Sequence, residues 1–230
     1  MNSLQTILES RDARAARQRE LLGAYPGATL ISFTVIPPGP VKRTAWSPAV
    51  AAEGLAALRE RFGASVSPPS PCHSRPIPRH SRPIPRHSRP IPRHSRPDRE
   101  SPFLFEEQRD LPTGFEAFLV VNLPAREVKR ACCEIEDSHP HGRLMDIDVL
   151  ERCPVEPGMK GKEPGMTGKE PGMTGSVTAG GDRLSILSRT EVGLPERRCL
   201  LCERPARECI RAGRHTTDEL LARISEILKR

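Results

Sequence analysis

Long apolar runs are missing from this sequence of 230 residues. No stretch approaches the roughly 20 consecutive apolar residues that a membrane-spanning helix needs, so we expect no membrane partner. The first 20 residues are polar and charged and hold no apolar core of the kind that signal peptides carry. We therefore expect a cytoplasmic protein.

A regular disulfide framework is also missing. The seven cysteines are odd in number, and several of them are closely spaced. In a chain for which no export signal is expected, this pattern favours reduced thiols or metal ligation over disulfide bonds.

Outside two repetitive segments, the sequence lacks an excess of charge of either sign. The formal net charge is +7, but residues 67–100 hold eight arginines against two acidic residues, and residues 152–183 hold five basic against four acidic residues. The remaining 164 residues carry 23 basic and 23 acidic side chains. The excess positive charge belongs to the repetitive segments, so we predict no specific nucleic-acid partner for the rest of the chain. An arginine-rich arm can still bind RNA or anionic lipid non-specifically.

Many of the 25 prolines and 17 glycines lie in these two segments. Ser-Arg-Pro-Ile-Pro-Arg-His occurs three times within residues 74–94, and Gly-Lys-Glu-Pro-Gly-Met-Thr occurs twice within residues 161–174. Closely spaced proline removes backbone donors, and the second repeat has almost no apolar side chains to bury. We predict that residues 67–100 and 152–183 are disordered inserts within one domain that spans residues 1–230.

The rest of the chain shows patterns of both helices and strands. Helix-forming composition, shared apolar faces and a Thr-x-x-Glu capping box predict helices over residues 11–22, 48–62 and 217–228. Apolar and β-branched runs predict strands over residues 29–36, 115–121, 131–135, 146–150 and 184–187. This order gives an α+β fold, a mostly antiparallel sheet with flanking helices. Residues 197–230 belong to the same domain.

Two aspartates on one predicted strand are the first candidate site. In an extended strand, Asp146 and Asp148 project to the same face roughly 7 Å apart, while Ile147 faces the other way. Paired carboxylates suit Mg²⁺, which combines one or two carboxylates with waters and substrate phosphates. Such a pair is also common on a solvated face, and that alternative stays open. A third carboxylate could come from Glu134 or Glu136.

Candidate phosphate-binding groups lie before this strand and in an early turn. Arg143 carries the guanidinium best shaped to bind phosphate oxygens. His139 could accept a proton or orient a phosphate, or it could simply bond the backbone of its turn. In Pro38–Lys42, Gly39 allows a close backbone approach and Lys42 could reach a phosphate. The alternative is a loop that only ends a strand.

A cysteine and histidine cluster lies near the end of the chain. Cys199, Cys202, Cys209 and His215 fall within 17 residues and include the Cys-x₂-Cys spacing that suits tetrahedral Zn²⁺. We predict a structural zinc site. Buried free cysteines are the alternative.

Several of these motifs resemble the citrate lyase holo-acyl-carrier-protein synthases, which are apo-citrate lyase phosphoribosyl-dephospho-CoA transferases. The matching segments are Pro38–Lys42, His139-Pro140, Gly142-Arg143-Leu144, Asp146–Val149, Arg197–Cys202, Ala206, Cys209 and His215. His141 stands where the family more often has leucine. The Asp-apolar-Asp pattern also resembles the strand with which polymerase-β-like nucleotidyltransferases bind Mg²⁺.

The resemblance implies a transferase. A serine of the acyl-carrier (gamma) subunit of citrate lyase would attack the triphosphoribosyl donor, accept the 2'-(5''-phosphoribosyl)-3'-dephospho-CoA group and release pyrophosphate. Asp146 and Asp148 would hold Mg²⁺, and Arg143 would stabilise the leaving group, with His139 as a further catalytic residue. Lys42, Gly39 and Gly142 would contact the substrate. The competing hypothesis is a zinc-stabilised binding module without catalysis.

Overall fold

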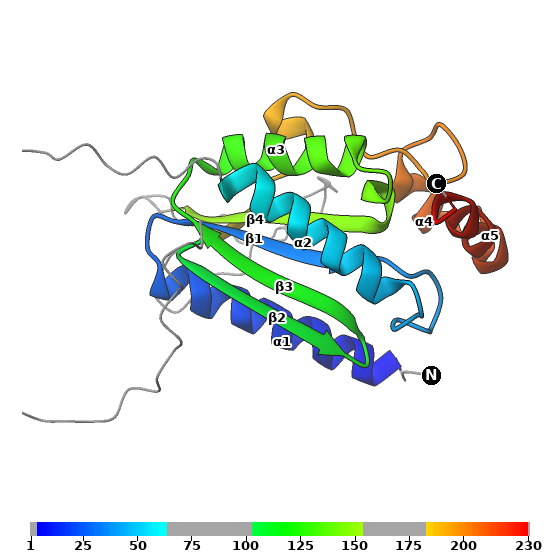
Figure 1. Cartoon of the computed structure of the whole chain (residues 1–230), viewed down its shortest axis with the longest axis horizontal. Coiled ribbons are helices and arrows are strands. Elements are labelled where there is room, and N and C mark those ends of the chain that lie inside the picture. Colours follow the sequence, from blue (N-terminus) through cyan, green and yellow to red (C-terminus); the bar gives the residue numbers. More distant parts are fainter. Residues whose placement is uncertain (1–3, 64–102, 154–182, 230) are drawn as a thin grey trace, which may run out of the picture.

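The computed structural model describes residues 4–63, 103–153 and 183–229 (Figure 1). The predicted insert 67–100 lies outside the described residues, as does the predicted insert 152–183 apart from its two ends. The elements, in chain order, are α1 (Leu4–Ala24), β1 (Thr29–Val35), α2 (Ser47–Gly63), β2 (Phe105–Leu111), β3 (Gly114–Val121), α3 (Ala125–Ser138), η1 (Gly142–Leu144), β4 (Met145–Cys153), β5 (Arg183–Ile186), η2 (Thr190–Val192), α4 (Ala206–Arg211) and α5 (Thr217–Ile227).

The described strands form one sheet in the order β2-β3-β1-β4-β5, and every neighbouring pair is antiparallel. The α+β prediction with a mostly antiparallel sheet is confirmed. The predicted hairpin between β4 and β5 also forms, with Leu150 opposite Ile186 and Arg152 opposite Leu184. Strand β1 lies in the middle of the sheet, and all of its residues except Thr34 are buried.

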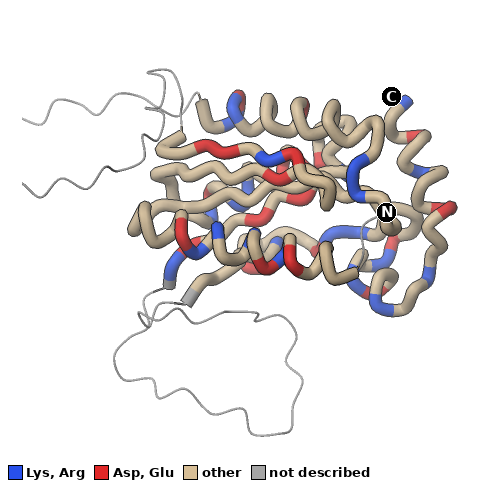
Figure 2. The backbone as a smooth tube through the Cα atoms, turned by 90° about the horizontal axis from the view of Figure 1, so that it is seen from below, with Lys and Arg blue, Asp and Glu red and all other residues tan. Residues whose placement is uncertain are grey.

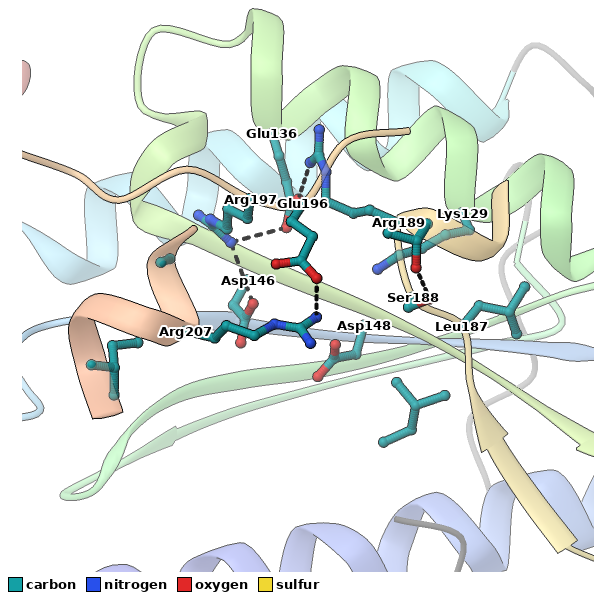
Figure 3. A pocket seen from close by; sticks show the side chains of 14 residues that line it. Lys129, Glu136, Asp146, Asp148, Leu187, Ser188, Arg189, Glu196, Arg197 and Arg207 are labelled. Atoms are coloured by element: carbon teal, nitrogen blue, oxygen red, sulfur yellow. Dashed lines mark hydrogen bonds and ion pairs between the residues drawn. The ribbon is translucent and has the colours of Figure 1, made fainter. Parts of the chain in front are cut away.

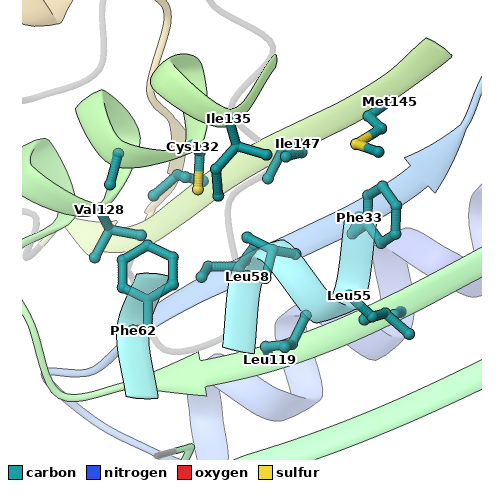
Figure 4. Packing of buried hydrophobic residues seen from close by; sticks show 14 of the residues in the cluster. Phe33, Leu55, Leu58, Phe62, Leu119, Val128, Cys132, Ile135, Met145 and Ile147 are labelled. Atoms are coloured by element: carbon teal, nitrogen blue, oxygen red, sulfur yellow. The ribbon is translucent and has the colours of Figure 1, made fainter. Parts of the chain in front are cut away.

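Helices cover both faces of the sheet: α2 and α3 pack on one face and α1 on the other (Figure 1). The alternation of side chains along β1 divides its residues between two cores. Ile31 and Phe33 join the larger core under α2 and α3, which Figure 4 shows, whereas Leu30 joins the smaller core over α1. Ile147 also belongs to the larger core, so the predicted inward direction of this side chain is correct.

One predicted strand is wrong, because residues 131–135 lie inside helix α3. Val128, Ala131, Cys132 and Ile135 are buried at the spacing of one helical face. Five residues are too short to show the period of a helix, which becomes visible only over the whole of α3. The error matters for the site because it moves Glu134 and Glu136 from a strand to a helix.

Strand β2 lies outside the predicted elements, because its sequence, Phe-Glu-Glu-Gln-Arg-Asp-Leu, has little apolar character. It is the edge strand next to β3, and its charges are paired across the sheet and with α1. Glu107 accepts a hydrogen bond of 2.8 Å from Arg17 of α1, and an ion pair of 2.8 Å joins it to Arg109. Charges of both signs are interspersed over the described chain (Figure 2).

The C-terminal helix α5 begins at the predicted capping box, in which Thr216 and Glu219 exchange hydrogen bonds. Ile224 and Ile227 of this helix are buried in the larger core, so the end of the chain packs on the same core as the sheet. Within the described residues, no helix combines the length and the apolar character required to cross a membrane.

Candidate functional site

The two predicted aspartates line one cavity at the edge of the sheet (Figure 3). Asp146 lies opposite Thr34 and Asp148 opposite Ser32 of β1, so both carboxylates lie on the face of β4 away from the core residue Ile147. Strand β5 pairs with β4 from Leu150 onward, beyond the aspartates. We call this cavity, of about 360 Å³, the aspartate cavity.

The two carboxylates repel each other. Burial and the neighbouring charge of Asp146 together raise the pKa of Asp148 to about 6. The Asp146 side chain is 47% exposed and is open to a ligand. Two adjacent carboxylates, one of them partly buried, are the ligands that a hard divalent cation prefers, and binding such a cation would relieve their repulsion.

Arg197 enters the aspartate cavity from a segment far along the chain. Its Nη1 lies 3.4 Å from an oxygen of Asp146, and its Nη2 donates to the carbonyls of Arg143 at 2.9 Å and Met145 at 2.7 Å. The guanidinium is therefore held by backbone beside the carboxylate pair. Arg197 was not a predicted site residue, although it lies within a segment that matches the family.

Glu136 is the nearer of the two proposed third carboxylates, but its oxygens are already occupied. Its side chain is 5% exposed, and it accepts a hydrogen bond of 2.9 Å from the backbone N–H of Ile147. Arg189 and Arg197 approach it at 3.1 and 3.4 Å. Burial raises the pKa of Glu136. The other candidate, Glu134, is exposed and pairs with Arg61.

Lys129 is a second cation of the aspartate cavity and was not a predicted site residue. It is 5% exposed, and its Nζ donates to the Ile147 carbonyl at 3.0 Å. The sequence feature that could have indicated its role is its position on the buried face of α3, between the apolar residues Val128 and Cys132. A lysine at such a position needs polar partners, which here are on β4.

Lys42, Gly39 and Arg143 lie together, but in a second cavity next to the first. We call it the basic cavity; its volume is about 460 Å³, and Arg197 lines both cavities. Burial lowers the pKa of Lys42, whose amine donates to the Pro37 carbonyl at 2.9 Å. Arg143 donates to the carbonyls of residues 198 and 199 and lines the basic cavity, whereas it is not among the described residues that line the aspartate cavity.

His139 and Gly142 are not among the described residues that line either cavity. His139 Nδ1 accepts the backbone N–H of His141 at 3.1 Å, which is the turn contact considered as an alternative, and His141 Nδ1 lies 2.6 Å from Glu53. Neither histidine is among the described residues that line the aspartate cavity. A Cβ on Gly142 would lie 2.5 Å from the Glu136 carbonyl oxygen, so this glycine permits a close approach to the end of α3.

The four predicted zinc ligands converge. One ligand atom from each of Cys199, Cys202, Cys209 and His215 lies within 4.8 Å of the others. The Sγ atoms of Cys202 and Cys209 are 3.5 Å apart, close to the ~3.8 Å between two thiolates that each lie ~2.3 Å from a tetrahedral Zn²⁺. His215 Nε2 is buried and has no hydrogen-bond partner among the residues that the structure describes. The cluster therefore fits zinc.

Comparison with known proteins gives a consistent result. The model of the family described as apo-citrate lyase phosphoribosyl-dephospho-CoA transferase matches residues 2–70, 94–156 and 178–230. The chain belongs to this family. The two unmatched intervals fall within the repeat segments.

Similar individual proteins carry the same description. A protein of Citrobacter koseri is 32% identical over 229 residues, which cover 98% of this chain and 88% of that protein. A protein of Escherichia coli O6:K15:H31 is 32% identical over 228 residues, with the same coverage of both chains. Both are named apo-citrate lyase phosphoribosyl-dephospho-CoA transferase. The similarity therefore extends over nearly the whole chain.

Proposed function

We propose that this protein transfers the 2'-(5''-phosphoribosyl)-3'-dephospho-CoA group from its triphosphoribosyl donor to a serine of the apo-acyl-carrier subunit of citrate lyase. The serine hydroxyl loses its proton to water and its oxygen forms a bond to the phosphorus next to the ribose, while the bond from that phosphorus to the outer two phosphates breaks and pyrophosphate leaves. Membership of the family and the names of the relatives support this proposal.

Asp146 and Asp148 are the residues that would hold Mg²⁺. Their two carboxylates on one strand face, and the raised pKa of Asp148, fit a divalent cation. When bound, the cation would supply charge neutralisation to the donor phosphates. The arrangement is similar to the Asp-apolar-Asp strand of nucleotidyltransferases, and we propose a nucleotidyltransferase-like site.

The cations around the aspartate pair would bind the donor phosphates. Arg197 is held by two backbone carbonyls, so its guanidinium is positioned beside Asp146 before a ligand arrives. Lys129 contributes a second positive charge from the helix side. Phosphoryl transfer depends mainly on positioning and charge neutralisation, which such preorganised groups supply. In this arrangement Arg143 and Lys42 would contact more distant parts of the donor.

One observation carries the proposal: Asp146, Asp148, Arg197 and Lys129 line a single cavity. The test incubates the full chain with apo-acyl-carrier subunit, donor and Mg²⁺, and measures the mass of the carrier. Asp146→Asn should slow the mass increase by about 100-fold or more, the scale on which a single electrostatic contact acts in catalysis. Glu151→Gln is the matched control, because Glu151 lies on the same strand but outside this cavity.

Two outcomes would contradict the proposal. The wild-type chain could leave the carrier mass unchanged, which would favour a zinc-stabilised binding module instead. Alternatively, Asp146→Asn and Glu151→Gln could modify the carrier at the same rate, which would remove the aspartate pair from the mechanism.

We further propose that Cys199, Cys202, Cys209 and His215 hold a structural Zn²⁺ within one transferase domain spanning residues 1–230. The convergence of the ligand atoms supports the zinc site. The burial of Ile224 and Ile227 in the core of the sheet supports the single domain. The polar character of the sequence supports a cytoplasmic location.

A further inference from the structure

The basic cavity is built differently from the aspartate cavity. Its floor and walls are largely apolar, with contributions from Leu144, Leu200, Leu220 and Ile224. Ile36 and Ile210 also line it and remain 43% and 79% exposed. Large apolar side chains that stay exposed around a cavity are typical of a site that a partly apolar ligand covers.

The charged residues of this cavity are all positive. Lys42, Arg143, Arg197 and Arg198 line it, and none of the described lining residues is acidic. Lys42 is partly desolvated, since burial lowers its pKa. Two of these cations, Lys42 and Arg143, are partly buried, and such cations favour an anionic ligand where no acidic side chain is among the described lining residues. The cavity therefore suits a molecule that combines phosphates with an apolar portion.

The two cavities are neighbours that share Arg197, Ala206 and Ile210 among their lining residues. One elongated ligand could therefore occupy both, with the reacting phosphates beside Asp146 and the remainder in the basic cavity. The volume of about 460 Å³ lies within the usual range of small-molecule sites, roughly 300–1,000 Å³.

We propose that the basic cavity binds the dephospho-CoA portion of the donor, with the diphosphate against the cations and the pantetheine arm against the apolar wall. This inference depends on the proposed function for the identity of the donor. Inorganic polyphosphate would satisfy the cations but leave the apolar wall uncovered, whereas dephospho-CoA supplies both kinds of contact. Cys199, Cys209 and His215 also line the cavity, so the zinc cluster would form part of the donor site.

The test is calorimetric titration of the full-length protein with dephospho-CoA, which lacks the phosphoribosyl triphosphate. Ile36→Glu introduces a carboxylate into the cavity at a partly exposed position and should raise the Kd at least about tenfold through repulsion of the diphosphate. Val41→Glu is the matched control: Val41 belongs to the same loop, is 49% exposed and is not a lining residue. Its Kd should stay within about twofold, because the new charge lies outside the cavity, where solvent screens it.

Lys42→Met supplies a second variant that keeps the apolar stem. It should also weaken binding and should reduce the dependence of Kd on salt. Equal affinities of wild type, Ile36→Glu and Lys42→Met would overturn the inference, as would a wild-type chain that modifies the carrier but does not bind dephospho-CoA. A third outcome separates the two proposals. If the wild-type chain binds dephospho-CoA, Ile36→Glu abolishes this binding and the wild type never modifies the carrier, the cavity assignment is supported and the proposed function is refuted.

Discussion

Replacement of Asp148 by asparagine should make the Mg²⁺-free protein more stable while it lowers transferase activity. The structure places Asp148 in a partly buried position beside Asp146, on the strand face that lines the aspartate cavity. Asparagine has nearly the same shape but no charge, so it removes the repulsion without leaving a void. A site that is strained until its ligand binds is expected to gain stability when the strain is removed.

The magnitude follows from the pKa of Asp148, which rises from the usual 3.8 to about 6 because of burial and the charge of Asp146. Each tenfold change in a protonation equilibrium is worth about 1.4 kcal/mol. Ionised Asp148 therefore lowers the free energy of unfolding by up to about 3 kcal/mol. The penalty is absent below the unfolded pKa, grows as the pH rises and is complete above the folded pKa of about 6.

The assay is calorimetric unfolding of the zinc-loaded wild type and Asp148→Asn in buffer without Mg²⁺. Near pH 7.5 the variant should melt about 6–12 °C higher, whereas near pH 4 the two melting temperatures should nearly coincide. Added Mg²⁺ should raise the melting temperature of the wild type more than that of the variant. An equal difference at both pH values, or a variant that is less stable at both, would show that ionised Asp148 does not destabilise the fold. Glu151→Gln controls for a loss of charge on the same strand.

Two further predictions concern the zinc cluster and the turn before β4. Cys202→Ser should reduce bound zinc, measured by elemental analysis, from one ion per chain to below half, whereas Cys133→Ser, at a buried cysteine outside the cluster, should leave it unchanged. Gly142→Ala should lower the free energy of unfolding by about 1–3 kcal/mol, because its Cβ would press on backbone carbonyls. Gly23→Ala, where a Cβ meets nothing within 4 Å, should be neutral or stabilising. Equal zinc contents, or equal stabilities of the two glycine variants, would contradict these predictions.

The sequence was most informative where a local pattern decides the structure, such as the alternation of polar and apolar residues in a strand or a capping box at the start of a helix. The period of two placed the aspartates on one face of β4, and the capping box located the start of α5. The same local reasoning failed where tertiary partners decide the structure. Strand β2 has few apolar residues and therefore lacks the sequence pattern of a strand. It forms because ion pairs with neighbouring elements compensate its charges, as between Glu107 and Arg17. Residues 131–135 are helical because the whole of α3 buries one apolar face.

The roles of the arginines show most clearly what sequence proximity cannot decide. Arg143 precedes Asp146 by three positions and was therefore expected beside it. However, η1 turns the chain just before β4, and the Arg143 side chain reaches the carbonyls of residues 198 and 199 instead. In return, Arg197 donates to the Arg143 carbonyl and lies beside Asp146. These reciprocal contacts fix the segment before the zinc cluster against the start of β4. Because the same contacts set the position of Arg197, a displacement of the cluster should reach the aspartate cavity through this arginine.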